Sequence, residues 1–175
     1  MIVFLTLIIR WSELFMQPLT PDHVRTVIES ANLGLHVQEF TESTATSELA
    51  AAAIGCEVGQ IAKSICMIVN GNPILVVASG DQQVDDRKIA TMFEVGRKKV
   101  KLAKPDQCID IYGYAPGGVP PVGHRTPDIP IYLDMLLKRY DTIYAAAGSA
   151  NHNFGMSIDQ LVALTEGTWA DVAKE

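Results

Sequence analysis

Two β-rich runs on either side of an Asn-Gly pair constrain the fold of this chain more than any other feature of its sequence. The runs cover residues 61–69 and 74–78, and Asn70-Gly71-Asn72-Pro73 separates them. Asn and Gly accept the positive φ angles that a tight turn between antiparallel strands requires. The sequence therefore predicts a β-hairpin over residues 61–78.

Signals for helices and further strands lie on both sides of this hairpin. Thr20-Pro21-Asp22 is a helix start, and Ser157-Ile158-Asp159-Gln160 is a capping box that begins a last helix ending at Leu164. Because helices and strands mix irregularly, we expect one α+β domain with a largely antiparallel or mixed sheet. The other expected helices are at residues 20–31, 47–54, 85–93 and from Pro105, and the other strands at 35–40, 100–102, 131–133, 142–147 and 153–158.

Length and composition agree with one packed domain. The chain has 175 residues, of which 48% are hydrophobic and 19% charged, and this excludes a disordered chain. Its three cysteines form no C-x-x-C pair and leave an odd one over. A disulfide framework is therefore not expected, and the default compartment is reducing, which favours the cytoplasm. We assign residues 16–175 to the domain and residues 1–15 to an N-terminal extension.

The extension begins with an apolar run at residues 2–9, and its eight residues are too few to span a bilayer, which needs about 20. It lacks the basic start of a signal peptide, and Arg10-Trp11-Ser12-Glu13 follows instead of a cleavage site. No membrane targeting is expected. Three interpretations stay open: an element that packs on the domain, a weak interfacial anchor, or a segment upstream of a true start at Met16.

The distribution of charge bears on nucleic-acid binding. A formal net charge of −6 argues against a broad, non-specific nucleic-acid surface. Five of the fourteen Lys and Arg residues nevertheless lie within eight consecutive positions. This group, called the basic stripe below, is either a solvated charged turn or a surface that contacts phosphates. Its members are Arg97, Lys98, Lys99, Lys101 and Lys104.

Most sequence signatures of enzymes are absent. The chain has no G-x-S-x-G elbow, no phosphate-binding glycine loop and no H-E-x-x-H, and its four histidines do not pair at metal-ligand spacing. We therefore expect no metal and no organic cofactor. An enzyme with this sequence would act through positioned backbone groups and through groups of its substrate.

Three places could carry chemistry, and each also has a plain structural interpretation. Lys63 lies at the start of an apolar strand, and it is interpreted either as a substrate contact or as an edge lysine. Residues 117–124, GGVPPVGH, are either a rigid loop whose N–H groups line an oxyanion site or a stiff connection. Residues 148–152, GSANH, form a turn between strands whose histidine lies in a pocket or on the surface.

Together these places resemble the YbaK and prolyl-tRNA-synthetase-associated editing-domain family. The matching features are Ile61-Ala62-Lys63-Ser64 opening a strand, Gly117-x-x-x-Pro121 in the loop, and the AGSANH turn before an acidic helix start. Their order and spacing match over residues 20–168. The resemblance implies a compact α+β fold with a mixed, barrel-like sheet wrapped by helices. It also implies a free-standing aminoacyl-tRNA deacylase.

The resemblance further implies roles for individual residues. Lys63 would position the substrate, the loop from Gly117 to Pro121 would hold the carbonyl and terminal ribose, and His152 would shape the amino-acid pocket. Water, aided by the substrate's own hydroxyl, would attack. The residues implied in catalysis are Lys63, Gly117, Gly118 and Pro121, those implied in substrate binding are Ser64, His124, Gly148, Ser149 and His152, and the basic stripe would contact tRNA.

The implied substrate is the acceptor end of a tRNA that carries a wrong, small amino acid. Size favours alanine first, then serine, cysteine or threonine, although Ser64 stands where alanine-specific branches often have asparagine. A synthetase is a second candidate partner, and nothing in the sequence sets an oligomeric state. Two alternatives are a non-catalytic module that binds aminoacyl-tRNA or a synthetase, and a small-molecule hydrolase unrelated to tRNA.

Overall fold

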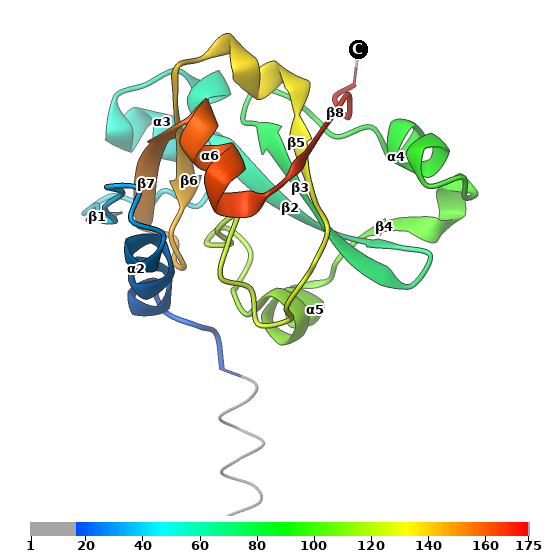
Figure 1. The fold of residues 1–175 in the computed structure, drawn as a ribbon, viewed down its shortest axis with the longest axis horizontal. Coiled ribbons are helices and arrows are strands. Elements are labelled where there is room, and N and C mark those ends of the chain that lie inside the picture. Colours follow the sequence, from blue (N-terminus) through cyan, green and yellow to red (C-terminus); the bar gives the residue numbers. More distant parts are fainter. Residues whose placement is uncertain (1–16, 175) are drawn as a thin grey trace, which may run out of the picture.

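The computed structural model describes residues 17–174, which form two β-sheets with helices packed around them (Figure 1). The predictions for residues 1–15 lie outside the described residues. The larger sheet has the strand order β4-β2-β3-β5-β8, and the smaller has the order β1-β7-β6. The strands are β1 (Gln38–Glu39), β2 (Ala62–Val69), β3 (Asn72–Ser79), β4 (Val100–Leu102), β5 (Ile131–Asp134), β6 (Thr142–Ala146), β7 (His152–Ser157) and β8 (Thr168–Ala170).

Helix ends agree with the capping residues of the sequence. Thr20 has the extended backbone of an N-cap, although its side chain makes no capping bond. The Thr46 hydroxyl accepts a bond from the Leu49 N–H at 3.3 Å, and the predicted capping box at Ser157 is confirmed. No helix within residues 17–174 is long and apolar enough to cross a bilayer. The helices are α2 (Pro21–Ser30), α3 (Ser47–Ile54), α4 (Asp86–Met92), α5 (Pro105–Gln107) and α6 (Ile158–Thr165), with shorter helical turns at Val58–Gln60, Arg97–Lys99, Cys108–Tyr112 and Met135–Arg139.

The predicted hairpin is confirmed as β2 and β3, which pair antiparallel along their whole length. Asn70 and Gly71, with φ angles of 48° and 86°, form a two-residue turn. Asn72 and Pro73, expected in the turn, belong to β3 instead. Because β2 also pairs antiparallel with β4, while the β3–β5 and β5–β8 pairs are parallel, the sheet is mixed.

The two sheets meet at the start of β2, where an isolated bridge joins Ile61 to Tyr144 of β6. The β-structure therefore continues from one sheet to the other, as in the mixed, barrel-like arrangement that the resemblance implied (Figure 1). The main apolar core includes residues of both sheets, α2 and α6, and a second core lies between the larger sheet and α4. Lys63 and Ser64 follow directly after the bridge, so the candidate site lies where the two sheets join.

Several short elements depart from the prediction. The strand expected at residues 35–40 is confined to Gln38–Glu39, the two residues that pair with β7. The short strand β8 and the turn at Cys108–Tyr112 have too few residues for a periodic pattern, so tertiary contacts determine them. The buried Tyr112 hydroxyl, for example, lies 2.9 Å from the Met67 carbonyl oxygen and 2.6 Å from that of Ile74.

Candidate active site

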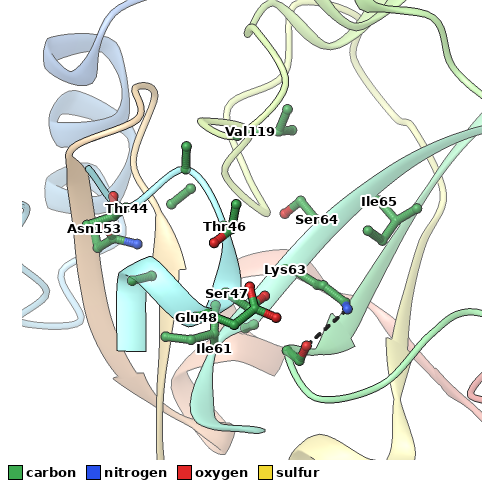
Figure 2. Close-up of a pocket in the computed structure, with 16 residues that line it drawn as sticks. Thr44, Thr46, Ser47, Glu48, Ile61, Lys63, Ser64, Ile65, Val119 and Asn153 are labelled. Carbon is green, nitrogen blue, oxygen red and sulfur yellow. Dashed lines mark hydrogen bonds between the residues drawn. The ribbon is translucent and has the colours of Figure 1, made fainter. Parts of the chain in front are cut away.

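A cavity of about 360 Å³ lies where the start of β2 faces the N-terminus of α3 (Figure 2). Its walls come from residues 44–48 and 50, at the start of α3, from residues 61–65 of the β2 segment, and from the proline-glycine loop at Gly117 and Val119. Gly80, Ala146 of β6 and Asn153 of β7 complete the lining. The cavity therefore lies between the two sheets, at their junction.

The lining residues differ in exposure, which gives the cavity a mouth and an inner end. Thr46 and Glu48 are exposed and mark the mouth. Ala50, Ile61 and Ala62 are buried and small or apolar, and they form the inner end. A substrate would thus enter past polar groups and reach small and apolar residues.

Lys63 contributes the one cationic side chain among the lining residues. Its ammonium donates a hydrogen bond to the Gly80 carbonyl at 3.1 Å and another to the Gln82 carbonyl, which hold the half-buried side chain in place (Figure 2). Burial lowers the pKa of Lys63, and the negative charges of Glu48, Asp81 and Asp134 act in the opposite direction. The two carbonyl oxygens and the three carboxylates favour the protonated form, in which Lys63 supplies a positive charge held in one place.

The N-terminus of α3 adds a second source of positive potential. The first N–H groups of a helix carry the positive end of its dipole and can hold an anion or a polarised carbonyl oxygen. Glu48 lies in this first turn, and its pKa is lowered by a hydrogen bond from its own backbone N–H, by the Thr46 hydroxyl and by the charge of Lys63. The helix terminus and Lys63 thus face the same cavity.

The glycines of the loop allow a close approach between two backbones. A Cβ atom on Gly118 would lie 2.8 Å from the backbone N and Cα of Ser149, which no side chain could occupy. The Gly148 N–H also donates to the Gly118 carbonyl at 2.9 Å. The proline-glycine loop therefore packs directly against the turn at residues 148–152. These are two of the three places that the sequence singled out.

Not every N–H group of this loop can serve a substrate. The Gly118 N–H donates to the Ala115 carbonyl at 3.1 Å and is therefore used within the loop. The N–H groups of Gly117 and Val119 donate to no group within residues 17–174, and both residues line the cavity. Gly117 and Val119 are thus the residues of this loop that line the cavity and whose N–H groups are not used within the described part of the chain.

Of the loop residues predicted for the site, Gly117 lines this cavity, whereas Gly118, Pro121 and His124 do not. Pro121 is buried and is not part of the lining. His124 lines a different hollow, beside Val27 and Thr126, and its Nε2 lies 2.9 Å from the Pro120 carbonyl oxygen. Burial lowers the pKa of His124, and its ring packs edge-on against Tyr112 at 5.8 Å between centroids. Their positions make Pro121 and His124 supports of the loop.

The late turn itself contributes no lining residue to the cavity, whereas Asn153, which follows the turn, does. Ser149 Oγ lies 2.7 Å from His152 Nδ1 and 2.8 Å from Asn151 Oδ1, and none of these three residues lines the cavity, nor does Gly148. Because successive residues of a strand point to opposite faces, Asn153 lines the cavity while His152 does not. His152 Nε2 instead lies 3.9 Å from Glu39 Oε2.

Sequence reasoning missed Thr44 and Asn153. Thr44 Oγ1, Ser64 Oγ and Asn153 Oδ1 are buried without a hydrogen-bond partner among the described residues, and all three residues line the cavity. Ser64 was a predicted substrate contact. Thr44 lies in an ordinary polar loop and Asn153 inside a strand, so neither carries a local signal that marks a site.

The basic stripe lies at the opposite end of β2 from Lys63. β4 pairs with Met67–Val69 at the far end of the strand, with Lys101 opposite Ile68. At about 3.3 Å per residue, the five steps from Lys63 to Ile68 correspond to roughly 16 Å. All five members of the stripe are exposed, and Arg97 pairs with Asp86 at 2.7 Å. The stripe therefore cannot contact a group that sits in the cavity.

Within residues 17–174, no three His, Cys, Asp or Glu side chains are grouped so that they could hold a metal ion. The charged side chains among the lining residues are instead those of Lys63 and Glu48, and the polar ones are those of Thr44, Thr46, Ser47, Ser64 and Asn153. They can bind a carbonyl, an ester or a hydroxyl.

Comparison with known proteins agrees with this geometry. The model of the aminoacyl-tRNA editing domain matches residues 41–164, which include every part of the cavity wall. The chain belongs to this family. YwhH of Bacillus subtilis, whose function is unassigned, is 35% identical over 87% of this chain and 96% of its own.

Two further relatives carry provisional names that concern editing. EbsC of Enterococcus faecalis, named as a Cys-tRNA(Pro)/Cys-tRNA(Cys) deacylase, is 28% identical over 76% of this chain and 80% of its own. A crystal structure of a protein named as a trans-editing enzyme for prolyl tRNA synthetase is 35% identical, with a TM-score of 0.82 over 89% of this chain and 97% of that one. The editing domain therefore matches in both sequence and fold.

Proposed function

We propose that this protein is a trans-acting deacylase that hydrolyses the ester between a small amino acid and the acceptor end of a wrongly charged tRNA. The observation that carries the proposal is one cavity that combines the Lys63 ammonium, the N-terminus of α3 and the N–H groups of Gly117 and Val119. Membership of the editing-domain family and the provisional names of EbsC and the trans-editing enzyme support it.

The chemistry needs little from the protein, because an aminoacyl ester is already activated. Water adds to the carbonyl carbon, the bond to the ribose oxygen breaks, and the products are a free amino acid and a tRNA with its terminal hydroxyl restored. The N–H groups of Gly117 and Val119 would stabilise the negative oxygen that develops in the transition state. The protonated Lys63 is a poor base, so we assign proton removal from water to the vicinal hydroxyl of the substrate, which passes its own proton to the leaving ribose oxygen.

The buried Ala50, Ile61 and Ala62 in the cavity lining support a small amino acid. A synthetase pocket separates amino acids that differ by one methylene by only about 1–3 kcal/mol, so a second site that accepts only the smaller residue is needed. By size alone, alanine is expected first, followed by serine, cysteine and threonine. The name of EbsC supports cysteine as a further candidate.

A panel of tRNAs charged with alanine, serine, cysteine, threonine and proline tests the proposal. We expect release of one or more small residues, sparing of proline, and no loss of activity in the presence of a chelator. Binding of charged tRNA without release would favour the non-catalytic module instead. Activity that a chelator abolishes and zinc restores would contradict the mechanism.

A further inference from the structure

The two carbonyl groups that hold Lys63 belong to one short turn, at residues 79–82. The Gln82 N–H donates to the Ser79 carbonyl at 3.0 Å, which closes the turn at the end of β3. The Lys63 ammonium donates to the Gly80 carbonyl at 3.1 Å (Figure 2) and to the Gln82 carbonyl. The position of the Lys63 charge therefore depends on the position of this turn.

Buried contacts fix the first half of the turn. Ser79 is fully buried, its N–H donates to Asp134 Oδ2 at 3.3 Å, and its Oγ lies 2.5 Å from the Gly59 carbonyl oxygen. A Cβ atom on Gly80 would lie only 2.2 Å from the Val58 carbonyl oxygen, so the backbone is tightly packed there.

An ion pair fixes the second half of the turn. Arg139 Nη2 lies 2.8 Å and 3.0 Å from the two carboxylate oxygens of Asp81, and it also donates to Ser79 Oγ at 2.9 Å. The hydrogen bond from Arg139 lowers the pKa of Asp81, so the carboxylate is charged at neutral pH. Arg139 ends the helical turn that follows β5. The pair thus joins the turn after β3 to the segment after β5.

Resting on the deacylase function proposed above, we propose that Asp81 and Arg139 are positioning residues of this active site, whose ion pair holds the turn that orients the Lys63 ammonium. Neither side chain lines the cavity, so both act through Lys63 and not on the substrate. The pair is partly exposed, and such pairs contribute little to folding stability. A catalytic charge, by contrast, must be held within about 0.5 Å of its productive position. Loss of the pair should therefore lower the rate without unfolding the protein.

The pair also bears on the protonation of Lys63. Burial lowers the pKa of Lys63. Three carboxylates, from α3, from the turn and from the end of β5, act in the opposite direction: Glu48, Asp81 and Asp134. Arg139 pairs with the second of them. Replacing Asp81 with Asn removes one negative charge, so the pKa of Lys63 falls further, and the charged form is lost at a lower pH.

The test measures kcat, KM and Tm of the full chain and its variants, with the charged tRNA from which the wild type releases its amino acid fastest. Asp81→Asn and Arg139→Gln should each lower kcat by about 10- to 100-fold, as expected for a misplaced catalytic group, with KM and Tm close to wild type. Arg139→Lys, which can still pair with Asp81, should restore most of the rate. In Asp81→Asn, the fall in rate at high pH should also begin at a lower pH than in wild type.

Asp171→Asn is the matched control, because it removes the carboxylate of another ion pair of the same length, 2.8 Å, between Asp171 and Lys88. It should leave kcat and the pH profile unchanged. If Asp81→Asn does not fold, the two Arg139 variants decide. An unchanged kcat, or a loss that follows the Tm and leaves the pH profile in place, would overturn the inference. A wild type that releases no amino acid from any charged tRNA would instead overturn the proposed function.

Discussion

The two ends of β2 present positive charge in opposite ways. At the first end Lys63 is half-buried, donates to two backbone carbonyls and lines the cavity at the junction of the two sheets. At the other end β4 and its flanking turns carry exposed basic side chains that face solvent. A charge held in a low-dielectric cavity acts on one bound group, whereas exposed charges act on a polyanion and are screened by salt. One strand can thus connect a site for chemistry with a surface for tRNA.

The largest expected effect comes from the cavity end. Lys63→Met should reduce deacylation by about 100-fold or more, the range seen when one electrostatic contact to a developing oxyanion is removed. Its Tm should stay close to wild type, because the methionine keeps the stem of the side chain. Single-turnover release of the amino acid measures the effect, and Lys101→Met is the control at the other end of the strand.

A second large effect is expected where the loop meets the late turn. Gly118→Ala would place a Cβ atom 2.8 Å from the backbone of Ser149, and neither backbone can move without opening the cavity wall. We expect about 1–3 kcal/mol of destabilisation, as for overpacked sites, together with loss of activity. Gly96→Ala, with no atom within 4 Å of the added Cβ, is the matched control. Equal stability of the two variants in urea would contradict the close contact.

The pH dependence of activity should sharpen the contrast between the two ends. Burial lowers the pKa of Lys63 below the ordinary lysine value of 10.5, and only the protonated form carries the charge. Activity should therefore be complete below this lowered pKa and fall as the pH rises through it. This fall in rate is measured as a function of pH with aminoacyl esters as substrates, after correction for their spontaneous hydrolysis. Lys63→Arg should move the fall in rate to higher pH. A fall that stays at the same pH in this variant would come from another titrating group.

The two ends of β2 differ in how far their structure could be predicted from the sequence. The hairpin and the helices with capping residues are local patterns and were found where expected, with a turn two residues shorter than predicted. The basic stripe is a local pattern too, and its contact with tRNA stays a prediction. Lys63 was recognisable because a charge opens an apolar strand. Thr44 and Asn153 were not, because their place in the cavity depends on β1, β7 and the late turn meeting in space. His152 was named for its place in the AGSANH turn, whereas the alternation of side chains along β7 places Asn153 in the cavity lining.

A moderate effect is expected at the stripe. Each phosphate contact to a single-stranded end contributes about −0.7 to the slope of log K against log salt. Replacing Lys98 and Lys99 with Glu should therefore weaken tRNA binding and flatten this slope, as measured by a filter-binding titration. The same slope in wild type and variant would show that the stripe faces away from the tRNA.

The smallest effect is expected from residues 1–15. Both ends of β2 lie within residues 17–174, so we propose that the extension is dispensable for chemistry. A chain that begins at Met16 should fold and deacylate at close to the full-length rate. An insoluble product would indicate that the extension packs on the domain.

We propose that one end of β2 serves the chemistry and the other binds tRNA. This claim is tested most directly by comparing charged tRNA with its short aminoacylated 3′-terminal fragment as substrates. We expect Lys63→Met to abolish release from both. The Lys98→Glu, Lys99→Glu double variant should lose rate only with the whole tRNA and should match the wild type with the fragment. Retained release in Lys63→Met, or equal losses of the double variant on both substrates, would contradict the account.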